Sequence, residues 1–182
     1  KTLALAAAMG GPAAGQGALI ASDINRARLS ELPARAERAG ARVETRLLNP
    51  GQEGAMLADL KDRCDLVLVD APCSGTGTWR RNPETRWRMT PKRLDALILS
   101  QRQVLGLAAR LCAPGGHILY AVCALTRAEG PEQIDAFLQV FPHYRAVDVP
   151  IPAGRRVGHG RMLTPCHDGS DGFFIARLEK TG

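Results

Sequence analysis

Two cysteines that stand directly after short apolar runs are the residues of this sequence best suited to covalent chemistry. Cys73 lies three residues beyond Asp70, which follows the apolar run 66–69. Cys123 follows a second short strand pattern, 117–122, whose residues after His117 are mostly apolar. In an open α/β sheet, the loops beyond the carboxyl ends of the strands form the ligand crevice. Two such loops can aim both sulfurs at one substrate, with a carboxylate beside them.

The turn that joins Asp70 to Cys73 is rigid, because Pro72 fixes its backbone φ and has no N–H donor. A protonated carboxyl at such a turn can hydrogen-bond a pyrimidine ring nitrogen. The alternative is a buried Asp70 that only caps a loop. Cys123 also has an alternative, since free cysteine often packs as a small hydrophobe. Its place at a strand end, before a polar loop, favours exposure.

Length and composition indicate one soluble domain. The chain has 182 residues, of which 45% are hydrophobic, enough for one buried core. Its five cysteines are odd in number and none is in a C-x-x-C pair, which favours a reduced, cytoplasmic protein without disulfides or a metal site. The apolar run 3–9 is too short to cross a bilayer. We expect a monomer with no membrane partner.

The basic residues indicate a nucleic-acid partner. The net charge is +6, and all but four of the 24 basic residues are arginine, which binds phosphate with two hydrogen bonds and stacks on bases. A GC-rich genome explains the overall arginine bias equally well. The segment 79–93 is more specific, because basic residues there alternate with tryptophans, as in binders of single-stranded or flipped bases. The candidate RNA contacts are Trp79, Arg80, Arg81 and Arg86. The alternative is a solvated loop that packs its tryptophans on the domain.

Helical and strand patterns alternate along the chain. The predicted helices are 2–9, 25–39 with a break near Pro33, 52–63, 91–112 and 131–140. The predicted strands are 18–21 ending at Asp23, 43–48, 65–69, 117–122, 144–149 and 173–178, with loops at 10–17 and 150–160. This order predicts an α/β fold with a largely parallel sheet and helices on both faces.

Two polar residues at other strand ends are candidate ligand contacts. Asp23 can hold the ribose hydroxyls of a nucleotide-like cofactor, or it can be the N-cap of the next helix. Arg28, one helical turn further on, can reach the same ligand or be an ordinary surface arginine. Asn49 can contact an adenine edge, and a simple turn role explains it equally well.

Several motifs resemble those of the Fmu/Sun/Nop family of RNA (cytosine-5) methyltransferases. The run 67–77, with 80–84 and Trp87, is similar to motif IV of that family. The run 115–125 with Glu129 is similar to motif VI, the helix 94–105 to the helix before it, and 163–165 with 168–178 to the closing motif. The resemblance implies a Rossmann-like class I methyltransferase that uses S-adenosylmethionine, with residues 1–182 as its catalytic domain and ribosomal or transfer RNA as its substrate.

The resemblance also implies roles for single residues. Cys123 would be the nucleophile that attacks carbon 6 of cytosine, and Cys73 would help the product to leave. Asp70 would contact the cytosine and the cofactor, which would also be held by Asp23, Arg28, Asn49 and Lys1. The chemistry agrees, because carbon 5 of cytosine becomes nucleophilic only after a thiolate adds at carbon 6.

This sequence departs from the family pattern at three places. Val122 and Ala124 flank Cys123 where the family has hydroxyl residues, and Asn49 stands where an acid is common. The chain resembles one that begins inside motif I, so we expect it to lack the first, central strand and the glycine-rich loop. The strands ending at Asp23, Asp70 and Cys123 should then share one sheet edge, with an empty strand position between the first two.

Three other functions are compatible with parts of this pattern. A DNA cytosine-5 methyltransferase uses the cysteine of its motif IV as the nucleophile, and the presence of Cys123 argues against it. A non-catalytic RNA-binding fragment is the second, because of the incomplete motif I. A nicotinamide-dependent oxidoreductase is the third, and it lacks the expected G-x-G-x-x-G sequence.

Overall fold

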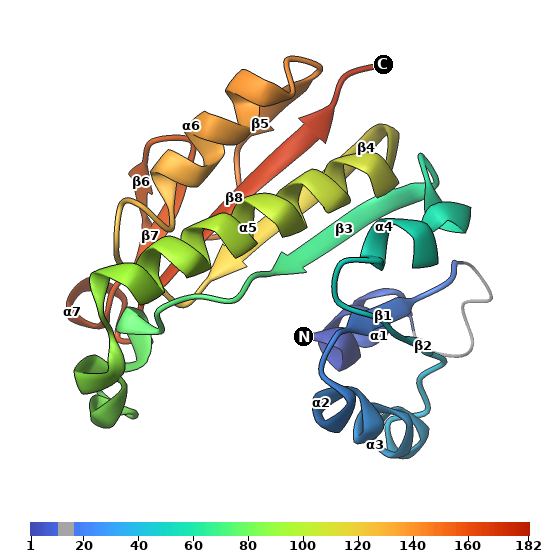
Figure 1. Cartoon of the computed structure of the whole chain (residues 1–182), viewed down its shortest axis with the longest axis horizontal. Helices are drawn as coiled ribbons and strands as arrows, with labels where there is room; N and C mark the ends of the chain where they lie inside the picture. Colours follow the sequence, from blue (N-terminus) through green and yellow to red (C-terminus); the bar gives the residue numbers. More distant parts are fainter. Residues whose placement is uncertain (11–16) are drawn as a thin grey trace. The chain divides into compact units, whose positions relative to one another are not determined.

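The computed structural model describes residues 1–10 and 17–182, so the middle of the predicted 10–17 loop lies outside the described residues. The chain divides into two compact units, residues 1–58 and 59–182 (Figure 1). Each unit has its own sheet, and the two are described separately.

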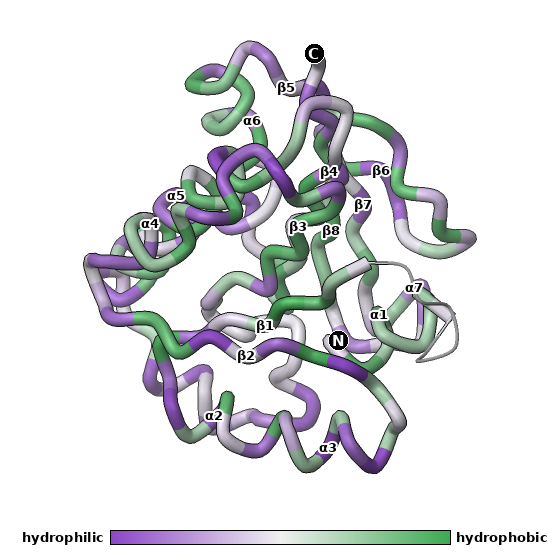
Figure 2. Tube along the Cα trace, turned by 90° about the vertical axis from the view of Figure 1, so that its right-hand side faces the viewer, coloured by the Kyte–Doolittle hydropathy of each residue, from purple (hydrophilic) through white to green (hydrophobic). Residues whose placement is uncertain are grey.

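The first unit is a two-stranded parallel sheet with short helices. Its elements are α1 (Thr2–Ala8), β1 (Ile20–Asp23), α2 (Arg26–Ser30), α3 (Leu32–Arg38), β2 (Glu44–Leu47) and α4 (Glu53–Met56). The break predicted near Pro33 is confirmed, because α2 ends at Ser30 and Pro33 occupies the first turn of α3. Purple segments recur along α2 and α3 in Figure 2, which reflects their arginines and Glu37.

The predicted helix 52–63 is wrong in its second half. After α4 the chain makes only a 3-10 turn, Ala58–Leu60, and Asp62 has a φ of 54°. The backbone N–H groups of Asp62 and Arg63 donate to the carbonyl oxygens of Arg110 and Leu111. These tertiary bonds replace the helical ones and direct the chain into the next strand.

The second unit contains a mixed six-stranded sheet. Its strands are β3 (Cys64–Asp70), β4 (Cys112–Val122), β5 (Tyr144–Val147), β6 (Arg155–Val157), β7 (Gly160–Leu163) and β8 (Phe173–Lys180). The order is β3-β4-β8-β7-β6, and β5 pairs with the far end of β8 beyond β7. Only β3 and β4 are parallel, so the predicted largely parallel sheet is wrong for this unit. The predicted α/β class is confirmed.

The core of the second unit lies on one face of β4 and β8. Alternate side chains of the two strands are fully buried: Ile118, Tyr120 and Val122 on β4, and Phe174, Ala176 and Leu178 on β8. Period-2 alternation of this kind puts one set of side chains on one face of a sheet. Helices α5 (Pro91–Leu111) and α6 (Pro131–Val140) cover that face (Figure 1). The prediction of helices on both faces involves both units and stays a prediction.

The predicted loop 150–160 contains part of a β-hairpin that the sequence pattern did not indicate. β6 and β7 are joined by two residues, Gly158 and His159, and Gly158 has a φ of 56°. Glycine at the first position of a two-residue turn suits a tight hairpin. The strands are only three and four residues long, too short to show a period. A 3-10 turn over Thr76–Thr78, another over Pro83–Arg88, and α7 (Pro165–Asp168) complete the unit.

The predicted common sheet edge is confirmed for two of its three strands. β3 and β4 are parallel neighbours, with Asp70 opposite Ala121, so Asp70 and Cys123 follow strands that end at the same edge. β1, which ends at Asp23, pairs with β2 in the other unit, and no ladder joins it to β3 in the described residues. Because β1 and β3 belong to different units, the expectation of one sheet stays a prediction for β1. A ladder needs an adjacent strand within about 4.8 Å, and the position beside β1 was the one expected to be empty.

Candidate active site

The two cysteines predicted to act together do meet in the structure. Each lies in the loop beyond its strand, and the parallel pairing of β3 with β4 brings these loops side by side. The Sγ atoms of Cys73 and Cys123 are 3.3 Å apart, and both residues are partly buried. Cys123 is thus neither a core hydrophobe nor fully exposed. Its neighbours Val122 and Ala124, where the family pattern has hydroxyls, are buried in the core.

Close backbone contacts hold the two thiol loops together. The Gly77 N–H donates to the carbonyl of Cys123 at 3.0 Å, and the Gly172 N–H donates to the carbonyl of Gly77 at 2.8 Å. A Cβ atom on Gly77 would overlap the Gly172 carbonyl, so only glycine permits this approach. The loop after β3, the loop after β4 and the start of β8 therefore form one packed edge.

The environment of the two sulfurs favours the protonated form of Cys73. The hydrogen bond with Cys123, burial, and the charge of Cys123 all raise the pKa of the Cys73 thiol well above its ordinary value. Cys73 therefore keeps its proton near neutral pH and can donate its S–H to the Cys123 sulfur. Because a thiolate is the nucleophile in cysteine chemistry, the raised pKa makes Cys73 a poorer nucleophile than an ordinary thiol.

Asp70 lies exposed at the end of β3, on the same edge as the thiols. The alternative of a buried cap is therefore wrong. The three predicted catalytic residues, Asp70, Cys73 and Cys123, are all at the carboxyl end of the parallel strand pair.

The predicted RNA-binding residues lie in the chain just after the Cys73 loop. The Arg86 guanidinium lies 5.9 Å from the ring centroid of Trp79 and 5.3 Å from that of Trp87, within cation–π range. Trp79 is partly buried, whereas Trp87 is 80% exposed. Trp87, which was not among the four predicted contacts, is therefore better placed than Trp79 to stack on a base.

Arg80 and Arg81, adjacent in sequence, have different surroundings. The Arg81 Nε and Nη2 atoms donate to Asp171 Oδ2 at 2.8 and 2.5 Å, and this pairing lowers the pKa of Asp171. Arg80 is exposed and has no ion pair among the described residues. The sequence did not indicate the Arg81 pair, because its members are 90 positions apart. A phosphate at Arg81 must compete with Asp171, and one at Arg80 need not.

The predicted cofactor residues Lys1, Asp23, Arg28 and Asn49 all belong to the first unit, whereas the two thiols belong to the second. Asp23 Oδ1 accepts the Asn25 N–H at 2.7 Å, and Asn25, not Asp23, is the N-cap of α2. Arg28 and Asn49 are exposed, and the Asn49 carbonyl accepts the Gln52 N–H in a turn. Lys1 is the N-cap residue of α1. The carboxylate at the end of β1 is thus held by its own loop.

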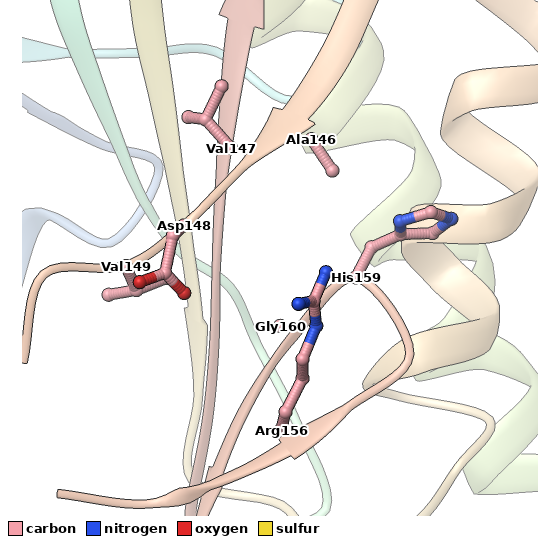
Figure 3. A pocket seen from close by; sticks show the side chains of 7 residues that line it. All are labelled: Ala146, Val147, Asp148, Val149, Arg156, His159 and Gly160. Atoms are coloured by element: carbon pink, nitrogen blue, oxygen red, sulfur yellow. The ribbon is translucent and has the colours of Figure 1, made fainter.

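A pocket in the second unit lies away from both cysteines. It is lined by Ala146, Val147, Asp148, Val149, Arg156, His159 and Gly160, and Figure 3 shows Arg156 and His159 on the β6–β7 hairpin facing the end of β5. Asp148 already pairs with Arg161 at 3.3 Å. Among the described residues, no three His, Cys, Asp or Glu side chains are grouped to hold a metal ion, and no helix is long and apolar enough to span a membrane.

Comparisons with known proteins identify the family of this chain. It is 37% identical over 170 residues to ribosomal RNA small subunit methyltransferase B of Thermus thermophilus, covering 92% of this chain and 41% of the relative. It is 36% identical over 189 residues to the probable ribosomal RNA small subunit methyltransferase B of Synechocystis, covering 99% and 40%. The chain thus spans about two fifths of the length of these relatives.

Solved structures confirm the predicted Rossmann-like methyltransferase fold. The crystal structure of PH0851 has a TM-score of 0.83 and 31% identity, covering 91% of this chain and 37% of that one. The structure of NSun6 from Pyrococcus horikoshii with SFG has a TM-score of 0.73 at 23% identity, covering 92% and 42%, and shows the same fold. The family model described as 16S rRNA methyltransferase RsmB/F matches residues 1–179. With this match along almost its whole length, the chain belongs to the RsmB/F family of 16S rRNA methyltransferases.

Proposed function

We propose that this chain is the catalytic domain of an S-adenosylmethionine-dependent RNA methyltransferase that modifies carbon 5 of cytosine. The observation that carries the proposal is the meeting of Cys73 and Cys123 at 3.3 Å, beside Asp70 at one sheet edge. Membership of the RsmB/F family and the names of the relatives support ribosomal RNA as the substrate class.

The two thiols divide the reaction between them. The Cys123 sulfur bonds to carbon 6 of the cytosine, which breaks the carbon 5–carbon 6 double bond and makes carbon 5 nucleophilic. S-adenosylmethionine, when bound, supplies an electrophilic methyl group for carbon 5. Transfer of the carbon 5 proton to solvent water then restores the carbon 5–carbon 6 double bond and expels the Cys123 thiolate. Cys73, still protonated beside it, assists this release, and Asp70 hydrogen-bonds the ring.

The first unit contains residues that fit the cofactor. A ribose diol needs a fixed acceptor, and Asp23 is held at the end of β1 by its bond from the Asn25 N–H. Arg28, Asn49 and Lys1 are further contacts in this proposal, with Asn49 facing the adenine edge. The RNA strand would contact Arg80, Arg81, Trp79 and Arg86, which follow the Cys73 loop.

Mass spectrometry of nucleosides tests this proposal. Cytosine-containing RNA and DNA are incubated separately with the protein and S-adenosylmethionine, then digested and analysed. We expect 5-methylcytidine from RNA and no methylated nucleoside from DNA. Methylation of DNA alone would favour the DNA-type enzyme. RNA binding without methylation, together with no calorimetric binding of S-adenosylmethionine, would favour the non-catalytic RNA-binding fragment.

A further inference from the structure

Glu129 is a buried acid that the proposed reaction does not use. Its side chain is fully buried and has no ion pair among the described residues. A buried carboxylate without a cation is costly unless hydrogen bonds replace its water. Glu129 Oε1 accepts the Ser74 N–H at 2.6 Å and Gln101 Nε2 at 3.2 Å, and Oε2 accepts the hydroxyls of Ser74 at 2.5 Å and Thr126 at 2.8 Å.

These hydrogen bonds connect both thiol loops. Ser74 directly follows Cys73, so two of the bonds hold the residue next to that thiol. Glu129 itself is in the loop after Cys123, and its carbonyl accepts the hydroxyl of Tyr120 on β4 at 2.8 Å. Gln101, on α5, also donates from Nε2 to the carbonyl of Pro72 at 2.8 Å, on the other side of Cys73. Both residues that flank Cys73 are therefore tied to one carboxylate, Ser74 directly and Pro72 through Gln101.

The two sulfurs do not depend equally on this carboxylate. Cys123 is also held by β4, whose last residues pair with both β3 and β8, and by the Gly77 N–H on its carbonyl. Cys73 lies in a loop beyond β3, and the bonds on either side of it, at Pro72 and Ser74, run through Gln101 and Glu129. Loss of the Glu129 charge should therefore displace Cys73 more than Cys123.

We propose that Glu129 is a positioning residue that holds Cys73 against Cys123, so that release of the methylated product depends on it. The link to release rests on the proposed function, whereas the link to thiol geometry does not. Removing the carboxylate charge should leave attack by Cys123 possible and impair the step that Cys73 assists.

The first test measures the thiol geometry without RNA or cofactor. Diamide oxidises two adjacent thiols to a disulfide, and its N=N bond takes up the two hydrogens. The rate at which the Cys73–Cys123 disulfide forms is followed by peptide mass spectrometry in the parent chain, Glu129→Gln and the matched control Glu132→Gln. Glu132 is exposed and pairs only with Arg127 among its described charged neighbours. We expect a rate about tenfold lower in Glu129→Gln, since one charge-assisted hydrogen bond is worth about that factor.

An unchanged rate in a folded Glu129→Gln protein would overturn the proposal. If that variant fails to fold, Thr126→Val removes a single donor to Glu129 Oε2 and replaces the first variant. Thr126→Val should slow disulfide formation by a smaller factor than Glu129→Gln. A rate of disulfide formation in Thr126→Val equal to that in Glu132→Gln would overturn the proposal in the same way. Thermal unfolding of each variant shows whether the protein is folded.

The second test measures release. With RNA and S-adenosylmethionine, Glu129→Gln should accumulate a covalent protein–RNA complex that a denaturing gel shows as a nuclease-sensitive band, whereas Glu132→Gln should turn over like the parent. Normal turnover by a Glu129→Gln protein that oxidises slowly would disprove the link to release. If the parent itself neither methylates nor crosslinks RNA, the proposed function fails, while the oxidation rates still decide the geometry.

Discussion

The Cys73 loop of the thiol site and the basic segment 79–93 follow one another in the chain, but their side chains are held in different ways. The thiols are partly buried, and short hydrogen bonds from three loops and a helix determine their separation. In the basic segment most charged side chains are exposed, and Arg86 contacts its neighbours through ring faces. Small displacements should therefore damage the first region severely, whereas changes in the second should be modest and depend on salt.

The largest effect should come from replacing each of the two cysteines by alanine. Cys123→Ala should abolish turnover and leave no covalent RNA adduct, because it removes the sulfur that bonds to carbon 6 in the proposed reaction. Cys73→Ala should still form the adduct but release it poorly, so a covalent complex should accumulate. A denaturing gel with RNA and S-adenosylmethionine measures both. An adduct with Cys123→Ala and none with Cys73→Ala would reverse the assignment and favour the DNA-type mechanism.

Adding a single methyl group at Gly77 should also reduce the methylation activity severely. In Gly77→Ala the new Cβ meets the Gly172 carbonyl, so the loops that hold Cys123 must separate. We expect methylation to fall about 10²-fold, the loss expected for a displacement of about 1 Å at a reacting group. Gly106→Ala is the control, because its Cβ would lie 3.9 Å from Phe141 Cζ, which is an ordinary contact distance. Equal activity of the two variants would contradict the packed edge.

The rate of thiol alkylation should distinguish Cys73 from the exposed Cys166. Because the pKa of Cys73 is raised, its reaction with iodoacetamide at pH 8 should be at least about tenfold slower than that of the exposed Cys166, as thiolate is the reacting form. The same shift lowers the free energy of unfolding as the pH rises above about 8.5, where the unfolded thiol ionises and the folded one does not. Peptide mapping after timed alkylation measures the rates, and equal rates for Cys73 and Cys166 would contradict the raised pKa of Cys73.

The smallest effect should distinguish the two adjacent arginines. Arg80→Ala should lower the slope of log affinity against log salt by about 0.7 on single-stranded RNA, the value for one phosphate contact. Arg81→Ala should lower it less, because Asp171 already balances that charge. Fluorescence anisotropy at several salt concentrations gives the slopes. Unchanged slope and affinity in both variants would assign the segment to the solvated-loop alternative.

Local patterns predicted the long elements and the strand ends well. The helix 91–112 appears as α5 because Thr90 caps its start and Pro91 opens it, both readable from sequence. The strand 117–122 is present, although β4 begins earlier, at Cys112, through an irregular stretch at Gly115. The hairpin β6–β7, the mixed sheet and the short α4 were not predicted, because each depends on pairing with distant strands or helix ends.

The sequence by itself determined the family, the two thiols and the edge at which they lie, since motif spacing and the order of strands and helices are local properties. Tertiary structure alone decided how the site is held. The Glu129 carboxylate joins residues 28 and 55 positions away, and Asp171 balances a charge 90 positions away. Such partners leave no periodic signal in the sequence, because a side-chain hydrogen bond depends on the distance between two residues in space. The burial that strengthens such a bond is likewise decided by the fold.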